Sequence, residues 1–142
     1  MVDVIGEFKS PKPMILKVNS VISLSNLASH TLKMVLLKQD VVFDPLTIDK
    51  FTGDITAYEQ DYSGYERKTL SNVTRVDNIS DRYLWIADDV TFESLYATVR
   101  YGLIIDDTTK DVISVMDLGD NLTFAGDITF DLNVHGFFGI KV

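Results

Sequence analysis

The sequence contains no cysteine and only two histidines, His30 and His135. Without cysteine the chain has no disulfide framework, no thiol nucleophile and no zinc–thiolate site. Two histidines are also too few for a multi-histidine metal site. At 142 residues the chain has the length of one domain. A domain of this size buries about 70% of its unfolded surface, so its core needs neither a metal nor a disulfide.

Alanine and glutamate are scarce as well, with 5 Ala and 4 Glu against 17 Asp. Asp favours turns and helix caps, whereas Ala and Glu favour the interior of helices. Val, Ile and Thr, which favour strands, together number 39. The composition therefore predicts strands joined by polar turns, and it excludes a helical bundle.

Long apolar runs are missing, because none approaches the roughly 18 residues that a membrane-spanning helix requires. The beginning of the sequence lacks the basic and apolar regions of a secretory signal. The Asn-x-Ser/Thr sequons at Asn72, Asn78 and Asn121 are therefore interpreted as turn sequences. We expect a soluble protein that is made in a cytoplasm and has no membrane partner.

The net charge of −8 is spread unevenly along the chain. Residues 72–142 carry 5 basic and 12 acidic side chains, whereas the first 38 residues carry 5 Lys and only 2 acidic residues. An acidic pI of 4.5 argues against a nucleic-acid partner. We expect an N-terminal arm over residues 1–28 and one domain over residues 29–142. The arm either docks on an acidic partner or is solvated surface, and its basic residues are Lys9, Lys12 and Lys17.

Alternation of polar and apolar residues predicts strands over 98–105 and 127–134, with a further strand over 111–117 between them. Asp106-Asp107 and Gly119-Asp120-Asn121 supply turn chemistry on either side of that middle strand. In residues 98–105 we expect one face to consist of Val99, Tyr101, Leu103 and Ile105, with Ile104 covered on the other side.

Upstream, residues 68–77 and 82–87 read as a hairpin around a turn at 78–81. Strands are also predicted over 31–37 and 136–142, while residues 14–28 form either a strand or a short helix. The segment 44–65 is predicted to be a long loop, called the excursion, that contains a strand at 54–59. Loops of this length are usually binding surfaces. About eight short strands with regular turns predict an all-β fold, an antiparallel β-sandwich or barrel.

Motifs for chemistry are weak. The sequence has no Gly-x-Ser-x-Gly elbow, no phosphate-binding loop and no Gly-x-Gly-x-x-Gly, and both histidines fit structural roles beside strands. The paired carboxylates fit strand-ending turns best, with a calcium site or a glycosidase pair as alternatives. These carboxylates are Asp88-Asp89, Asp106-Asp107, and Asp117 with Asp120. We expect no enzymatic activity and no cofactor.

Tyrosines stand out in the long excursion. Aromatic residues at strand positions are expected in the core, but Tyr58, Tyr62 and Tyr65 lie in a predicted loop. Tyrosine buries a large area with little loss of side-chain freedom, which suits it to protein interfaces. The three residues therefore either form a partner-binding surface or pack the loop onto its own domain.

From Ser29 onward, the chain contains a series of short motifs in a fixed order. In chain order they are Thr31–Leu37, Phe51 with Asp54-Ile55, Gly64-Tyr65, Thr69–Thr74, Ala87–Phe92, Ala97–Asp107, Val115–Gly119 and Asp127–Asp131. The order of these motifs resembles a group of small virion proteins of tailed bacteriophages. Gly64-Tyr65 in this chain is followed by Glu66-Arg67-Lys68, where the relatives usually have small residues or glycine.

The resemblance implies a jelly-roll-like β-sandwich that is a structural component of the particle. It implies a decoration or cement protein on the capsid exterior, which binds the major capsid protein as a homo-oligomer, a dimer or trimer. Members of the group are also described as head-fibre or tail-associated. The alternative from a different class is a carbohydrate-binding sandwich at the tail or fibre, an adhesin that uses the Asp pairs and tyrosines.

Overall fold

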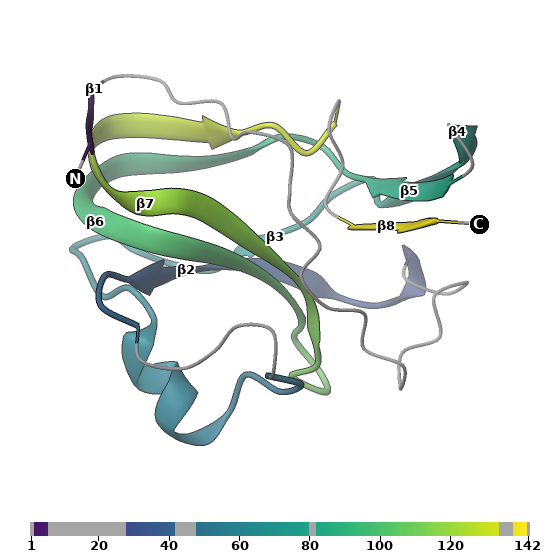
Figure 1. Cartoon of the computed structure of the whole chain (residues 1–142), viewed down its shortest axis with the longest axis horizontal. Helices are drawn as coiled ribbons and strands as arrows, with labels where there is room; N and C mark the ends of the chain where they lie inside the picture. Colours follow the sequence, from purple (N-terminus) through teal and green to yellow (C-terminus); the bar gives the residue numbers. More distant parts are fainter. Residues whose placement is uncertain (1, 6–27, 42–47, 80–81, 134–137, 142) are drawn as a thin grey trace.

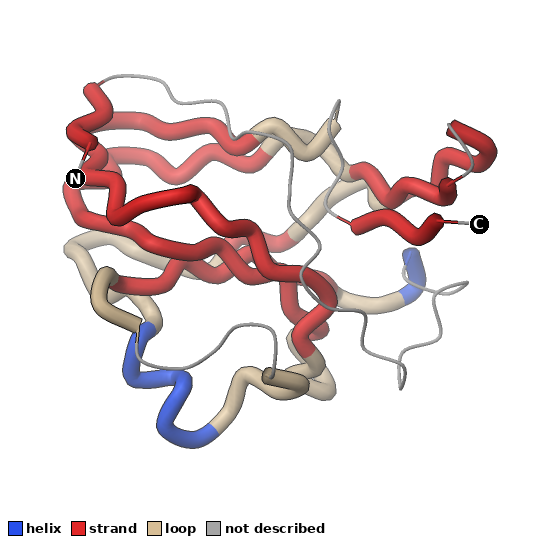
Figure 2. Tube along the Cα trace, in the orientation of Figure 1, coloured by secondary structure: helices blue, strands red, loops and turns tan. Residues whose placement is uncertain are grey.

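The computed structural model describes residues 2–5, 28–41, 48–79, 82–133 and 138–141, and it is almost entirely β (Figures 1 and 2). The expected all-β class is therefore confirmed. Its one described stretch of several helical residues is the 3-10 helix η2, Gly53–Tyr58. The strands are β1 (Val2–Ile5), β2 (Leu32–Lys38), β3 (Lys68–Thr69), β4 (Thr74–Ile79), β5 (Arg82–Ile86), β6 (Val90–Asp106), β7 (Val112–Phe130) and β8 (Phe138–Lys141).

The strands form a five-stranded sheet in the order β1-β7-β6-β2-β3 and a three-stranded sheet in the order β4-β5-β8. All neighbouring pairs are antiparallel except β1 and β7, which run parallel with Val2 opposite Leu122. The expectation of purely antiparallel pairing is thus wrong at this edge. Residues 2–5, which we placed in an N-terminal arm, form the edge strand of the larger sheet. Residues 6–27 lie outside the described part of the chain.

The two longest strands, β6 and β7, form a hairpin of 17 and 19 residues. We expected two separate strands in place of β7, with a turn at Gly119–Asn121, and this prediction is wrong. The sheet register shows that the segment is a bulge, because Val99 pairs with Leu122 while Tyr101 pairs with Asp117. Gly119 adopts a positive φ of 86°. The residues around it form a bulge, in which β7 has more residues than the facing part of β6, and the chain does not reverse direction there.

Other predicted strands are confirmed in part. The strand expected over 68–77 is divided, because Lys68–Thr69 form β3 and pair with β2, whereas Thr74–Ile79 form β4 in the smaller sheet. The hairpin of β4 and β5 pairs Thr74 with Ile86, β2 matches the strand expected at 31–37, and β8 lies within residues 136–142. The strand expected at 54–59 is wrong, because η2 occupies this position. Ile55 and Tyr58 are the partly buried residues of η2, and their spacing of three fits a 3-10 helix. Most of the ambiguous segment 14–28 lies outside the described residues.

Two hydrophobic cores lie on opposite faces of the larger sheet. The first core is built around Met34, Phe92, Phe124 and Phe130, with β6 and β7 contributing most of its side chains. Figure 1 shows that β6 and β7 bend near their middle, so the hairpin borders this core from more than one side. The second core is smaller, and it is covered by the segment around η2; its members include Val35, Leu37, Ile48, Phe51, Leu103 and Ile105.

The bulge also decides which core each residue of β6 enters. Leu103 and Ile105 face the second core while Ile104 faces the first, so the expected burial on both sides is confirmed. Val99 was expected on the face of Leu103, but it lies in the first core. The reason is the register shift between Val99 and Tyr101, which changes the alternation of faces along the strand.

Candidate functional site

The long excursion between β2 and β3 is fixed onto the sheet by hydrogen bonds. Gln60, which is buried, donates its side-chain amide to the carbonyl of Thr98 at 2.6 Å and its backbone amide to Leu36 at 2.9 Å. Earlier in the excursion, the amide of Phe51 donates to the carbonyl of Lys110 at 2.8 Å. Because its backbone is tied to the sheet at these points, the excursion presents a preformed surface.

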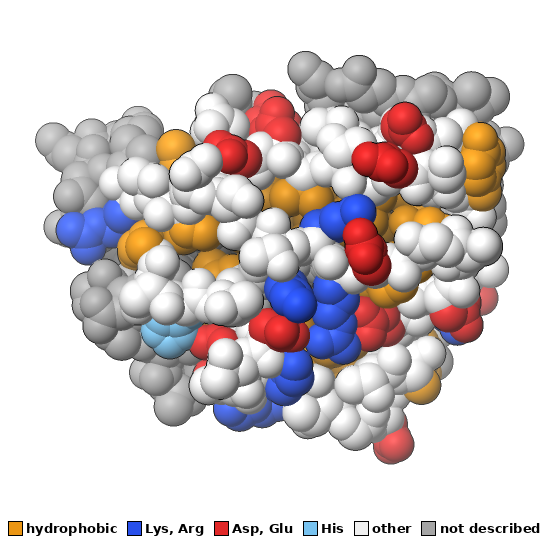
Figure 3. Space-filling view, turned by 180° about the vertical axis from the view of Figure 1, so that it is seen from behind, with side chains coloured by type: hydrophobic (Ala, Val, Ile, Leu, Met, Phe, Trp, Pro, Cys, Tyr) orange, Lys and Arg blue, Asp and Glu red, His pale blue; other side chains and the backbone are white. Residues whose placement is uncertain are grey.

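An ion cluster lies where the excursion returns to β3. Its centre is Arg67, whose guanidinium donates to both oxygens of Glu59 at 2.9 Å and to Asp107 Oδ1 at 3.3 Å. Lys33 and Lys110 also approach the carboxylate of Asp107, at 3.3 Å and 2.9 Å. We call these five residues the Arg67 cluster. In the view from behind, basic and acidic side chains are interleaved across the middle of the molecule (Figure 3).

The electrostatics of the Arg67 cluster favour the ionised forms of Arg67 and Asp107. The hydrogen bond to Glu59 raises the pKa of Arg67 despite its partial burial. Hydrogen bonds from Lys110 and then Lys33 hold the pKa of Asp107 below its usual range. Groups with these shifts do not exchange protons near neutral pH, so the arrangement suits a rigid structural surface better than acid–base catalysis.

The loop tyrosines are partly buried. Tyr65 stacks on Phe92 with ring centroids 6.3 Å apart, and Tyr62 meets Tyr65 edge-on at 5.4 Å. The Tyr65 hydroxyl donates to Glu59 at 2.8 Å and accepts the Leu36 amide at 3.3 Å. Burial and then the bond to Glu59 raise the pKa of Tyr65 far above its usual value.

These contacts describe the loop packing that the sequence left open as the alternative to partner binding. Tyr58 packs against the second core, whereas Tyr62 and Tyr65 pack against the first. The remaining surface of the three side chains stays a predicted partner contact. Lys9, Lys12 and Lys17, the other predicted contact residues, lie outside the described residues.

The paired carboxylates differ in their position along the strands. Asp88-Asp89 and Asp106-Asp107 lie at strand ends, as the turn interpretation predicts, whereas Asp117 and Asp120 lie inside β7, where this interpretation is wrong. Asp89 Oδ1 accepts the amides of Leu132 and Asn133 at 3.1 Å and 3.2 Å. Asp117 Oδ1 accepts the Gly119 amide at 2.8 Å and also bonds to Arg100. Among the described residues, no group of three or more His, Asp or Glu side chains is arranged to hold a metal ion.

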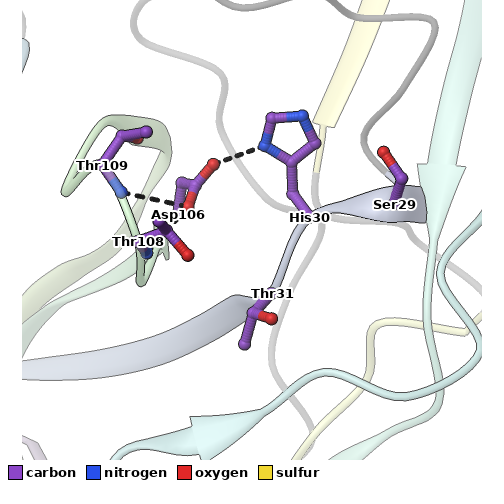
Figure 4. Close-up of a pocket in the computed structure, with 6 residues that line it drawn as sticks. All are labelled: Ser29, His30, Thr31, Asp106, Thr108 and Thr109. Carbon is purple, nitrogen blue, oxygen red and sulfur yellow. Dashed lines mark hydrogen bonds and ion pairs between the residues drawn. The ribbon is translucent and has the colours of Figure 1, made fainter.

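A small cavity of about 250 Å³ lies beside the start of β2 and is lined by Ser29, His30, Thr31, Asp106, Thr108 and Thr109 (Figure 4). His30 Nδ1 bonds to Asp106 Oδ2, and the figure shows Ser29 on the far side of the imidazole from Asp106. Asp106 Oδ1 accepts the amides of Thr108 and Thr109 at 2.9 Å and 3.3 Å.

This bonding favours a structural role for His30. The Thr108 and Thr109 amides beside the cavity already donate to Asp106, so neither is free to stabilise a developing oxyanion. His30 instead ties the chain before β2 to the end of β6. Sequence patterns do not predict this pair, because the two residues are 76 positions apart and meet only through the pairing of Leu32 with Asp106. His135 lies outside the described residues.

Acidification is expected to weaken the fold below about pH 4. Burial opposes ionisation of Asp106, but the bonds from His30 and from the Thr108 and Thr109 amides outweigh it and lower its pKa below the ordinary 3.8. A group with a lowered folded-state pKa stabilises the fold above its unfolded pKa and loses this contribution as the pH falls through the folded pKa. The pKa values of Asp107, Asp111 and Asp117 are also lowered.

Urea unfolding of the wild type and of Asp106→Asn between pH 7 and pH 2 measures this contribution. At pH 7 we expect the variant to be less stable by about 2 kcal/mol, because the bonds to a charged acceptor are lost. The difference should shrink as the pH falls below 4. A difference that stays constant down to pH 2 would show that the pKa of Asp106 is the same in the folded and unfolded states, which contradicts a lowered folded-state pKa.

Within the described residues, no helix has the length and hydropathy needed to span a membrane. No protein-family model, curated protein or solved structure matches the chain with significant similarity.

Proposed function

We propose that the chain is a structural protein of a tailed-bacteriophage virion, a decoration or cement protein that binds the major capsid protein lattice. The observation that carries the proposal is the preformed surface of the excursion, which is held by Gln60 and by the Arg67 cluster. A surface that is ordered before binding loses little conformational entropy when a partner docks. The ordered motifs that resemble phage virion proteins identify the kind of partner.

The finer architecture belongs to the same proposal. We infer a jelly-roll-like β-sandwich in which the five-stranded and three-stranded sheets supply the two layers. On this proposal the protein is made in the host cytoplasm and then occupies the capsid exterior as a dimer or trimer. Contact with the lattice would involve the remaining surface of Tyr58, Tyr62 and Tyr65, together with Lys9, Lys12 and Lys17.

The mechanism is stabilisation by mass action. A protein that binds the assembled lattice but not its dissociated subunits shifts the equilibrium toward the assembled state. Each oligomer contacts the lattice through more than one copy of the chain, so it binds more tightly than a single copy would. No chemical step is involved, which agrees with a surface whose charged groups are fixed in ion pairs.

Purified particles of the phage that encodes the chain provide the test. Quantitative mass spectrometry is expected to find many copies per particle, at a fixed ratio to the major capsid protein. Particles depleted of the chain should release their DNA at a lower temperature and regain their stability when the purified chain is added back. A few copies per particle would instead place the protein at the tail or fibre, and its absence from particles would contradict the proposal.

A further inference from the structure

Half of the β6–β7 hairpin has an outer face that no described segment of the chain covers. Near Leu103 and Ile105 both faces of the hairpin are buried, because the excursion covers the second core there. Between Val90 and Thr98 only the inner face is buried, through Val90, Phe92 and Leu95. On the outer side, Tyr96 is 68% exposed and is the one large exposed hydrophobic residue among those described. An aromatic residue left open on a sheet face is typical of an interaction surface.

Cross-strand contacts order the exposed face. Tyr96 pairs across the hairpin with Ala125, whose small side chain leaves one side of the ring uncovered. Pairs of threonine hydroxyls lie on either side of Tyr96 along the hairpin. Thr98 bonds to Thr123 and Thr91 bonds to Thr129, each at 2.9 Å. These pairs fix the neighbouring side chains, so the surface is formed before a partner arrives.

Two carboxylates adjoin Tyr96 on this face. Glu93 and Asp127 are both exposed, and Asp127 lies opposite Glu93 and Ser94 between the pairs Phe92–Ile128 and Leu95–Gly126. Asp127 accepts the Ser94 amide at 2.8 Å. Neither Glu93 nor Asp127 forms an ion pair with any lysine or arginine in the described part of the chain, unlike the acids of the Arg67 cluster. Like charges on adjacent strands repel, and a cationic partner would relieve that repulsion.

We propose that this face, defined by Glu93, Tyr96 and Asp127 and called the acidic Tyr96 face, binds an arginine- or lysine-bearing segment of a partner protein. The inference rests on the proposed function, since it identifies the lattice as the source of that segment. The guanidinium of an arginine stacks on a tyrosine ring and bonds to carboxylates at the same time. The hydroxyl groups of the two threonine pairs provide the polar rim of such a contact.

Charge complementarity selects this occupant over a second copy of the chain. Residues 72–142 carry 12 acidic and 5 basic side chains, so two copies joined through this face would bring like charges together. A basic segment is attracted from a distance, and its association weakens as salt screens the carboxylates.

Two binding measurements test the acidic Tyr96 face. The first is cosedimentation of the chain with particles depleted of it, and the second is an NMR titration with a hexa-arginine peptide. We expect Tyr96→Ser to weaken binding to the particles about thirtyfold, as for a central aromatic contact. The double variant Glu93→Gln/Asp127→Asn should weaken it about tenfold and remove most of the salt dependence. Glu66→Gln is the matched control, because Glu66 is an exposed acid on another part of the surface.

The outcomes separate this inference from the proposed function. If the wild type sediments with particles and the face variants sediment equally well, the inference is wrong while the proposed function stands. If the wild type does not sediment, the proposed function fails, and the peptide titration alone shows whether the face binds arginine. If Tyr96→Ser converts an oligomer into a monomer in analytical ultracentrifugation, a second copy covers the face and the inference is overturned.

Discussion

Replacement of Phe92 by alanine is expected to lower the free energy of unfolding by about 3–5 kcal/mol. The side chain is fully buried, and its ring meets Phe130 edge-on at 5.7 Å and Tyr65 face-on at 6.3 Å. Truncation removes the apolar area of the ring and leaves a cavity between β6, β7 and the excursion, which those elements can fill only in part. For a chain of this length, the expected fall in melting temperature is about 10–15 °C.

Tyr96→Ala provides a matched control, since it also removes an aromatic ring from β6. Tyr96 lies only four positions along the strand but faces solvent, so its loss should change stability by less than about 0.5 kcal/mol. Urea unfolding followed by the fluorescence of Trp85, which is buried in the same core as Phe92, measures both variants. Equal effects from the two substitutions would contradict the assignment of inner and outer faces.

Replacement of Arg67 by methionine should have the second largest effect, a loss of about 2–3 kcal/mol. Methionine keeps much of the apolar stem of Arg67 but removes the guanidinium. Glu59, whose side chain is only 17% exposed, then keeps its charge without its main partner. Tyr65 still donates to Glu59, so part of the site remains bonded and the loss stays below that of a fully buried charge.

A double-mutant cycle separates the ion pair from the packing of Arg67. When Glu59→Gln is combined with Arg67→Met, the loss should be smaller than the sum of the two single losses, because the unpaired charge is gone. Lys68→Met is the control, since its partner Glu66 is 73% exposed and such pairs contribute about 0–1 kcal/mol. Additive losses would show that Arg67 stabilises the protein through packing alone.

The sequence predicted the features that depend on local chemistry. Local residue patterns located β2, the end of β6 and the β4–β5 hairpin, and Asp89 lies between β5 and β6 as the turn interpretation indicates, whereas Asp117 lies inside β7. Local chemistry could not distinguish a turn from a bulge at Gly119, because both use a glycine with positive φ and a neighbouring aspartate. Which of the two forms depends on whether the flanking residues continue to pair with β6, and this is a property of the whole sheet.

Such local patterns could not predict contacts between segments that are distant in the sequence. The His30–Asp106 pair and the bonds from Arg67 to Asp107 both depend on the register of β2, β3 and β6. The predicted loop left two alternatives for Tyr58, Tyr62 and Tyr65, a partner-binding surface or packing of the loop, and the excursion folds back and packs them against the two cores. Sequence patterns did not single out Tyr96, because nothing in the local sequence shows that its side chain is exposed.

The parallel pairing of β1 with β7 has a consequence for synthesis on the ribosome. Residues Val2–Ile5 are translated long before their partners Leu122–Ala125. Until β7 has been made, β1 therefore lacks this partner, and its backbone groups remain open to pairing with another molecule. The larger sheet can acquire β1 only after β7 has been made, so a chain terminated before Leu122 would keep β1 without this partner.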